Sequence, residues 1–393
     1  MEHFSFNLDL DSISLILLSA LSFFLIIQLV YYWGVLAKPY YYQKKIKKGI
    51  ISTPNSQPPI SIIICARNEA ENIQKFLPLI LEQDYPTYEV IVVNDNSTDD
   101  SEDILKRLES KYKHLYHTYI PQGTKNLSRK KLGITLGVKA AKYDTLLFTE
   151  IDSHPIGKNW VANMARHFSD KKTIVLGFCA FEKQKGFLSK FASFDYFFSN
   201  LQMIAMTLLK QPYGANGRNL AYQKSHFDSQ KGYSKHRFLQ MGEDDLFVNE
   251  VATKRNIAVE LSPESIIATQ REGLFEWKDI KINRAITKRF YKKGPVLFWR
   301  LELACRFFFA ASFMACFIYG FWNIILPASA LLAFIIRFLS QLFVINKTAG
   351  YLKLEKFYFT IPLFDFMQPF VNTYFYIYRL LKGKKNYTWN IKG

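Results

Sequence analysis

Two stretches of this sequence decide its fold: Pro59-Ile-Ser-Ile-Ile-Ile-Cys-Ala-Arg-Asn-Glu69 and Glu89-Val-Ile-Val-Val-Asn-Asp-Asn-Ser-Thr-Asp99. Each begins with a short apolar, mostly β-branched run, which is typical of a strand buried on both faces, and each ends in polar residues. A third such run, residues 145–149, is followed by Glu150-Ile-Asp152. Because helical patterns separate these runs, the sequence predicts an α/β fold with a doubly wound, mostly parallel sheet.

The expected elements of this domain follow one another along the chain. We expect strands at residues 60–65, 89–93, 145–149 and 174–178, and helices at residues 68–81, 101–112, 131–141 and 188–209. In a parallel sheet, ligands bind beyond the carboxyl ends of the strands. The polar residues that follow each strand are therefore the candidates for function.

Apolar residues gather at the two ends of the chain. Residues 13–36 contain no charged side chain and are long enough to cross roughly 30 Å of hydrocarbon. Four lysines follow between residues 44 and 48, and basic residues beside a membrane helix usually stay on the cytoplasmic side. We therefore expect a multi-pass protein of the inner (cytoplasmic) membrane, with its central domain in the cytoplasm.

The second apolar region begins after Arg300. Residues 307–322 and 324–344 indicate a hairpin of two membrane helices. The second helix carries Arg337, whose charge must face protein or reach the interface. Residues 357–381 are also hydrophobic, but prolines and Asp365 interrupt them, so an interfacial helix and a spanning helix stay open as alternatives.

The net charge of +18 has two candidate explanations, nucleic acid and anionic lipid. Much of the charge lies beside apolar segments, so membrane lipids are the expected partner and no nucleic acid is expected. The four cysteines form no CxxC pair, as expected of a reducing compartment. Clusters of basic residues occur at 278–293 and 382–385, and an amphipathic interfacial helix is predicted from the spacing of Lys281, Arg284, Lys288 and Lys292.

These features predict five segments. They are a membrane helix with a basic flank at 1–50, a catalytic domain at 51–276, a basic interfacial helix at 277–300, a membrane hairpin at 301–350, and an interfacial or membrane helix with a cytoplasmic tail at 351–393.

Acidic residues follow three of the predicted strands, at Glu69, Asp95 and Glu150-Ile-Asp152. Carboxylates accept hydrogen bonds from bases and ribose hydroxyls, and they are the hard oxygen ligands that Mg²⁺ or Mn²⁺ requires. Together these acids predict a site for a nucleotide diphosphate.

The ordered set of motifs resembles the family 2 glycosyltransferases, which have the GT-A fold. The two opening stretches look like the first two strands and turns of that family, and Glu150-Ile-Asp152 takes the place of its metal-binding DxD motif. Lys130 and Lys131 match its basic patch. Gly214-Ala-Asn-Gly-Arg-Asn-Leu-Ala-Tyr222 is similar to its acceptor-side segment, and Gly242-Glu-Asp-Asp-Leu246 matches its ED motif. The resemblance runs from about residue 58 to residue 293.

The resemblance implies a role for each matched residue. The nucleoside is expected at Ala66, Glu69 and Asp95, and the diphosphate and ribose at Lys130, Glu150 and Arg284. For Arg284, a contact with a lipid headgroup stays open as an alternative. The divalent metal, Mg²⁺ or Mn²⁺, is expected at Asp152. The acceptor is expected at Asn216, Gly217, Arg218 and Asn219.

The resemblance also implies an inverting reaction with Asp244 as the general base and Glu243 and Asp245 as its neighbours. The donor is expected to be a nucleotide diphosphate sugar, with a UDP-sugar weakly preferred. The acceptor is expected to be a lipid-linked saccharide or a lipid, because the interfacial helix and the membrane hairpin would hold the site at the membrane.

The sequence departs from the family pattern in two places. Glu150 replaces the first Asp of DxD, so it would approach the metal differently or serve only the ribose. Lys281-Ile-Asn-Arg284-Ala285 keeps the arginine of the processive Gln-x-x-Arg-Trp motif but lacks its tryptophan, which favours single transfer. A processive polysaccharide synthase and a non-catalytic nucleotide-sugar-binding membrane protein stay open as alternatives. His154 is a further candidate metal ligand, or a hydrogen-bonding residue of a polar loop.

Overall fold

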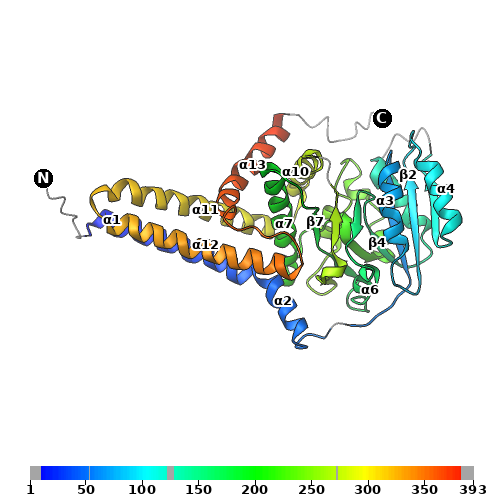
Figure 1. Cartoon of the computed structure of the whole chain (residues 1–393), viewed down its shortest axis with the longest axis horizontal. Helices are drawn as coiled ribbons and strands as arrows, with labels where there is room; N and C mark the ends of the chain where they lie inside the picture. The colour runs from blue at the N-terminus through cyan, green and yellow to red at the C-terminus, as the bar shows by residue number, and fades with distance from the viewer. Residues whose placement is uncertain (1–9, 53, 122–127, 271–272, 382–393) are drawn as a thin grey trace.

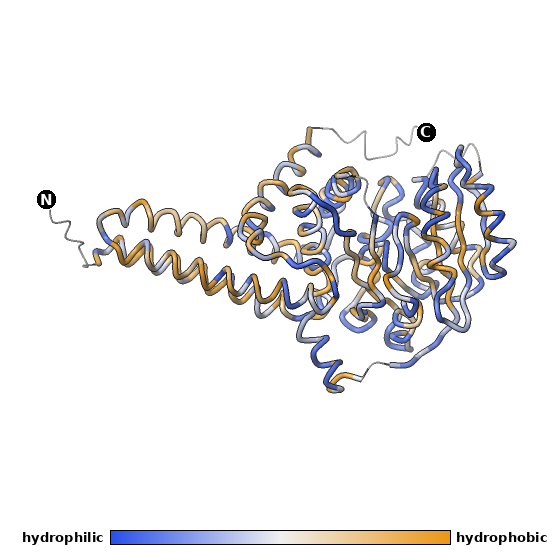
Figure 2. The backbone as a smooth tube through the Cα atoms, in the orientation of Figure 1, coloured by the Kyte–Doolittle hydropathy of each residue, from blue (hydrophilic) through white to orange (hydrophobic). Residues whose placement is uncertain are grey.

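The computed structural model describes residues 10–52, 54–121, 128–270 and 273–381, so the lysines predicted to matter at 382–385 lie outside the described residues. An α/β domain lies at one end of the described molecule and a long rod of helices projects from it (Figure 1). Figure 2 shows that the rod is hydrophobic along most of its length, whereas the α/β domain is hydrophobic mainly along its strands.

The main sheet has seven strands in the order β3-β2-β1-β4-β8-β6-β9. All neighbouring pairs are parallel except those of β8, which runs antiparallel to both β4 and β6. The strands are β1 (Ile60–Ala66), β2 (Tyr88–Asn94), β3 (Leu115–Tyr119), β4 (Thr145–Phe148), β6 (Ile174–Leu176), β8 (Leu220–Gln223) and β9 (Ile257–Val259). The mostly parallel sheet predicted from the sequence is confirmed.

A second, smaller sheet has three short strands in the order β5-β10-β7. It comprises β5 (Ser153–Pro155), β7 (Cys179–Phe181) and β10 (Ile267–Thr269). None of these strands was expected from the sequence, because three-residue strands are too short to show a periodic pattern.

The helices of the domain lie on both sides of the sheet. They are α3 (Ala70–Leu81), α4 (Ser101–Lys111), α5 (Arg129–Ala140), α6 (Trp160–Ala165), α7 (Phe187–Leu208), α8 (Lys224–Ser229), α9 (Asp245–Val251) and α10 (Phe275–Thr287). Helix α5 packs on β1 and β2, and two glycines let it approach closely. A Cβ atom at Gly137 would lie 2.5 Å from Ile63 Cγ2, and one at Gly133 would lie 2.8 Å from Cys65 Sγ. This close packing holds the start of α5 over the carboxyl ends of the strands.

Three of the described helices are long and apolar enough to cross a membrane: Ser12–Lys47, Lys293–Tyr319 and Ile325–Tyr351. The first comprises α1 (Ser12–Leu29), a π-helical stretch (Val30–Leu36) and α2 (Lys38–Lys47), and the other two are α11 and α12. Their length and composition suggest association with a membrane. A last helix, α13 (Ile361–Leu381), packs against α7, α10 and α12.

The predicted interfacial helix is shorter than expected. Helix α10 ends at Thr287, a 3-10 turn covers Lys288–Phe290, and Lys292 has an extended backbone with φ −49° and ψ 131°. The expectation that Lys292 continues the basic face of one helix is therefore wrong. Pro295 accounts for the break, because a proline is tolerated in the first turn of a helix, here α11, but interrupts a helix that runs through it.

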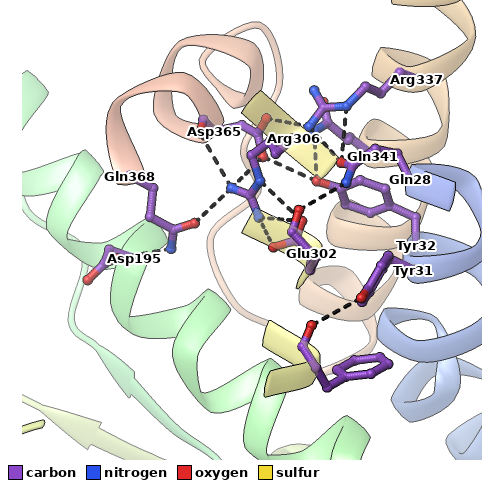
Figure 3. A network of polar contacts seen from close by, with 11 residues as sticks. Gln28, Tyr31, Tyr32, Asp195, Glu302, Arg306, Arg337, Gln341, Asp365 and Gln368 are labelled. Carbon is purple, nitrogen blue, oxygen red and sulfur yellow. Dashed lines mark hydrogen bonds and ion pairs between the residues drawn. The ribbon is translucent and has the colours of Figure 1, made fainter. Parts of the chain in front are cut away.

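A buried network of charges joins the membrane helices to α13 (Figure 3). Arg337 of α12 faces protein, the first of the two expected alternatives, and its Nη2 lies 2.7 Å from Asp365 Oδ2 of α13. Arg306 of α11 lies 3.0 Å from the other oxygen of Asp365 and 2.7 Å from Glu302 Oε1. Tyr32 of the first membrane helix donates to Asp365 Oδ1 over 3.2 Å. Two arginines and two acids balance in charge, so the network fixes four helices without a net buried charge.

Replacing Asp365 by alanine is expected to reduce the free energy of unfolding by about 3–5 kcal/mol, because Arg337 loses its acid while it stays buried. Denaturant titration of the detergent-solubilised protein, followed by circular dichroism, measures the change. Phe366→Leu is the matched control, since Phe366 is the next residue and is 58% exposed. Equal stability of the Asp365→Ala and Phe366→Leu variants would contradict the role given to the network.

Candidate active site

The carboxyl ends of β1 and β2 form the first part of the candidate site. Ala66 ends β1, and its carbonyl accepts from the backbone N–H of Asp95 over 2.8 Å. The turns that follow the two strands are tied together, because Asn68 N–H donates to Ser97 Oγ over 2.9 Å and Thr98 N–H donates to Asn68 Oδ1 over 2.8 Å. Asn68 has a φ of 54°, in the left-handed region that asparagine tolerates. The edge where a nucleoside is expected therefore has a defined shape.

Asp95 and Glu69, the acids expected to hold the nucleoside, both have partners at this edge. Asp95 forms an ion pair with Arg129, and Glu69 Oε2 accepts from Asn72 Nδ2 over 2.6 Å. Arg129 was not among the expected site residues, although it directly precedes Lys130. Arg129 and Lys130 begin α5, so the same helix start meets the nucleoside edge and the cleft described next.

Lys130 lies between two acids from different parts of the chain. Its Nζ lies 2.5 Å from Glu150 Oε1, just after β4, and 2.8 Å from Glu243 Oε1, just before α9. Although burial alone would lower the pKa of the Lys130 ammonium, the charges of Glu150 and Glu243 raise it well above its usual value. Lys130 therefore carries its positive charge throughout the physiological range of pH.

Lys131 is separated from the site. Its side chain is fully buried, and its Nζ donates to the carbonyls of His236 over 2.7 Å and Leu239 over 2.9 Å. Burial lowers the pKa of Lys131 to about 8. Of the two lysines in the expected basic patch, Lys130 lines the cleft and Lys131 stabilises a loop.

Arg218 bridges the two acids of the Glu150-Ile-Asp152 motif. Its Nη2 lies 2.6 Å from Glu150 Oε2 and 2.8 Å from Asp152 Oδ2. Burial by itself would raise the pKa of Glu150, but the charges of Arg218 and Lys130 lower it to about 2. The arginine that the resemblance assigns to the acceptor therefore contacts the acids assigned to the diphosphate and metal.

The donor atoms near Asp152 fit a divalent cation that is shared with a diphosphate. Glu150 and Asp152 supply carboxylate oxygens, and their side chains are 24% and 20% exposed. Mg²⁺ commonly takes one or two carboxylates and completes its coordination with phosphate oxygens and water. In the described part of the chain, no group of three or more His, Cys, Asp and Glu side chains surrounds one point. The cation's remaining ligands would therefore come from the substrate.

His154, the further candidate ligand, has other partners. Its ring stacks on Phe76 with centroids 4.7 Å apart, and its Nε2 lies 3.6 Å from Glu182 Oε1. Burial lowers the pKa of His154, so its ring is neutral near pH 7. These contacts hold the ring by stacking, and its Nδ1 has no hydrogen-bond partner among the described residues, so neither alternative for His154 is favoured.

Asp244 precedes helix α9 and caps its first turn. Its Oδ1 accepts from the Asp245 N–H over 2.7 Å, and its Oδ2 accepts from the Gly217 N–H over 2.8 Å. Burial in the cleft, followed by the charges of Asp245 and Glu243, raises the pKa of Asp244 to about 7. A carboxylate with this pKa can accept a proton near neutral pH and release it again.

Asp245 connects the site to the interfacial helix. Its Oδ2 accepts from Thr287 Oγ1 and from the Tyr291 hydroxyl, each over 2.5 Å. Both donors lie at or just after the end of α10. Because Asp245 is buried and uses its carboxylate in these bonds, it positions α9 against α10 rather than acting as a second base.

The Gly214–Tyr222 segment divides between the cleft and the core. Asn216 lines the cleft and donates to the Tyr196 hydroxyl over 2.7 Å. Asn219 is 1% exposed; it accepts from Trp160 Nε1 over 3.0 Å and donates to the carbonyls of Phe178 and Ser265. Asn219 therefore has no surface with which to contact an acceptor.

One cavity of about 80 Å³ brings together most of these groups. Ala66, Glu69, Asp95 and Asp152 are not part of its lining; the first three lie at the ends of β1 and β2, and Asp152 adjoins the cavity through Arg218. Tyr196 of α7 also lines the cavity, although it was not among the expected site residues. The centroid of its ring lies 5.9 Å from the guanidinium carbon of Arg284. The charged residues that line the cavity are Lys130, Glu150, Arg218, Glu243, Asp244, Asp245 and Arg284.

Comparison with known sequences gives short but consistent matches. The chain is 37% identical over 83 residues to β-monoglucosyldiacylglycerol synthase of Nostoc sp., and 43% identical over 60 residues to glycosyltransferase AglE of Haloferax volcanii. It is 24% identical over 134 residues to poly-β-1,6-N-acetyl-D-glucosamine synthase of Staphylococcus epidermidis. These matches cover 21%, 15% and 34% of the chain, and 16%, 20% and 30% of the respective relatives.

The fold and the family agree with these matches. The mannosyltransferase PcManGT of Pyrobaculum calidifontis, solved in complex with GDP-mannose and Mn²⁺, superposes with a TM-score of 0.50 and 19% identity. The similarity covers 84% of this chain and 96% of that one. Residues 61–231 match the family model described as Glycosyl transferase family 2. Residues 61–231 therefore match the family 2 glycosyltransferases, and the described chain has the GT-A fold with helices attached that can span a membrane.

Proposed function

We propose that the protein is an inverting glycosyltransferase that moves a sugar from a nucleotide diphosphate sugar to a membrane-associated acceptor. The observation that carries this proposal is the meeting of Asp244 with Lys130, Glu150 and Arg218 in one cleft beside the carboxyl ends of the strands. Such a cleft can hold a departing diphosphate and an attacking hydroxyl on opposite sides of one sugar carbon.

Asp244 is proposed to act as the general base. It would take the proton of the acceptor hydroxyl while that oxygen bonds to the anomeric carbon and the bond from this carbon to the diphosphate breaks. Attack from the side opposite the leaving group inverts the configuration. The raised pKa of Asp244 supports this role, and it also favours an enzyme over a non-catalytic sugar-binding protein.

The diphosphate is proposed to lie against Lys130, Glu150 and Asp152. A divalent cation, Mg²⁺ or Mn²⁺, held by Asp152 with Glu150 nearby, would stabilise the negative charge of the leaving group. Arg218 would then move from the two acids or turn to the phosphate oxygens. The nucleoside is proposed to occupy the edge formed by Ala66, Glu69 and Asp95, with a UDP-sugar weakly preferred as donor.

The acceptor is proposed to be a lipid or a lipid-linked saccharide at the cytoplasmic face of the inner membrane. The lysines at the end of α2 support this orientation, since basic flanks usually stay in the cytoplasm. The name of the Nostoc relative, β-monoglucosyldiacylglycerol synthase, denotes a glycolipid and supports a lipid acceptor. The Staphylococcus relative is named a polysaccharide synthase, so processive synthesis is the second candidate. Products with one added sugar would indicate single transfer, and a ladder of products with many added sugars would indicate processive synthesis.

The Asp244→Asn variant is expected to lose transfer by about 10²- to 10⁴-fold while it keeps its nucleotide affinity, because the substitution removes the proton acceptor and preserves the side-chain shape. Release of the nucleoside diphosphate from a panel of nucleotide sugars, measured in membranes with and without Mn²⁺, tests this. Asp170→Asn, at an exposed position outside the cleft, is the control. Turnover near that of the control would refute the assignment.

The rate of transfer is expected to rise with pH through a midpoint near 7, because only the ionised form of Asp244 accepts a proton. Glu243→Gln removes one of the negative charges that raise the pKa of Asp244, so its midpoint should move to lower pH. Profiles of kcat/KM against pH for both proteins measure the shift. A midpoint that is unchanged or higher in Glu243→Gln would contradict the explanation.

The Asp152→Asn variant is expected to weaken Mn²⁺-dependent nucleotide binding by about tenfold or more, because a carboxamide is a poor ligand for a hard cation. Calorimetric titration with the nucleoside diphosphate, with Mn²⁺ and then with chelator, measures this loss. If Asp152→Asn retained the full Mn²⁺ effect, the cation would have to be bound elsewhere.

A further inference from the structure

A second and larger cavity, of about 400 Å³, adjoins the active-site cleft on its membrane side. Helices α7, α10 and α13 and the first turns of α11 contribute to its walls, and these four helices meet where the rod joins the α/β domain (Figure 1). Arg284 lines both this membrane-side cavity and the active-site cleft. The two spaces therefore share one wall.

The acids of the membrane-side cavity are already paired. Lys281 lies 3.0 Å from Asp195 Oδ2, and Arg306 lies 2.7 Å from Glu302 Oε1. Figure 3 shows these acids joined to the network at Asp365, where Gln368 links α13 to α7 through a 3.0 Å bond to Asp195. This balanced network keeps the walls of the cavity at fixed positions.

The other cations of the cavity have no such partners. Within the described residues, no carboxylate forms an ion pair with any of five lining cations: Arg284, Lys288, Arg289, Arg300 and Arg379. Arg379 does donate to the Ala285 carbonyl over 2.8 Å. Five unpaired positive charges around one cavity form a site for a multiply charged anion, because each gains a charge-assisted hydrogen bond when the anion binds.

Apolar groups complete the same cavity. Tyr213, Trp299, Leu303 and Phe375 line it together with the cations. Outside it, α11 exposes Leu297 and Leu301, as expected of a surface that faces lipid chains. A free inorganic anion would leave these apolar walls unused, and a neutral lipid would leave the cations unused. A phosphate attached to a lipid chain satisfies both.

We propose that the membrane-side cavity binds the phosphate of a lipid acceptor, so that the acceptor is a phosphate- or diphosphate-bearing lipid. This inference rests on the proposed function and names its acceptor class. With the phosphate on the unpaired cations around Arg284, a hydroxyl of the group attached to that phosphate can enter the cleft that contains Asp244. The hydrogen bonds that Thr287 and Tyr291 donate to Asp245 fix the position of the membrane-side cavity relative to the active-site cleft.

The test measures binding of a short isoprenyl phosphate to the full-length protein in detergent, without a donor sugar. The matching isoprenol, which lacks phosphate, and inorganic phosphate, which lacks the chain, are the comparison ligands. The isoprenyl phosphate is expected to bind on the order of tenfold or more tightly than either. Equal binding of the isoprenol would overturn the proposal, and equal binding of inorganic phosphate would reduce the cavity to a site for free anions.

A pair of double variants locates the site. Lys288→Gln with Arg300→Gln should weaken binding of the isoprenyl phosphate by on the order of 10- to 100-fold. Lys278→Gln with Lys293→Gln removes the same charge from the same edge of the membrane, outside the cavity lining, and should leave binding nearly unchanged. An equal loss in both double variants would mean that general surface charge, and not the cavity, attracts the ligand.

The design separates this inference from the proposed function. Nucleotide affinity, measured on the same double variants, reports whether they are folded and should be unchanged. The Asp244→Asn variant should still bind the isoprenyl phosphate. If that lipid does not bind but transfer to a neutral acceptor occurs, the inference fails and the proposed function stands.

Discussion

The alternation of positive and negative side chains at the carboxyl edge of the sheet is the constraint on which the site depends. Lys130 lies between Glu150 and Glu243, and Arg218 lies between Glu150 and Asp152. Without these two cations, the acids would repel one another inside a cleft that limits access of water. Close packing of α5 on the sheet supplies Lys130, and the turn before β8 supplies Arg218. A divalent cation could take the place of Lys130 or Arg218 beside the acids, and a diphosphate could take the place of the acids beside these two cations.

Asp245 extends this arrangement toward the membrane. Its neighbour Asp244 holds the raised pKa, while Asp245 itself is bonded to Thr287 and Tyr291 beyond the end of α10. The segment that leads into helix α11 thus positions the start of α9. A displacement of that segment would be transmitted to the proposed base through two hydrogen bonds. Chemistry and membrane attachment are in this way parts of one packed unit.

Charge is arranged differently around Asp365 and in the adjoining membrane-side cavity. Around Asp365, two arginines are matched by two acids and serve to hold helices together. In the adjoining membrane-side cavity, cations outnumber acids, and the excess faces a space wide enough for a ligand. Such an excess favours an anion, here proposed to arrive with the substrate, because each unpaired cation can gain a charge-assisted hydrogen bond. The balanced network holds the walls of the cavity in place, and the unpaired cations are the groups that would bind an anion.

The sequence by itself determined the strands and helices that have a clear periodic pattern, the glycosyltransferase motifs and the need for Arg337 to face either protein or the membrane interface. These features are encoded locally, because burial on a strand or helix repeats every few residues. Only the tertiary structure decided which partner each polar side chain has. Asn219 and Lys131 belong to matched motifs yet are buried in the core, whereas Arg218 contacts the acids of the metal motif. Their partners lie tens of residues away along the chain, and no local pattern specifies a contact that long-range packing creates.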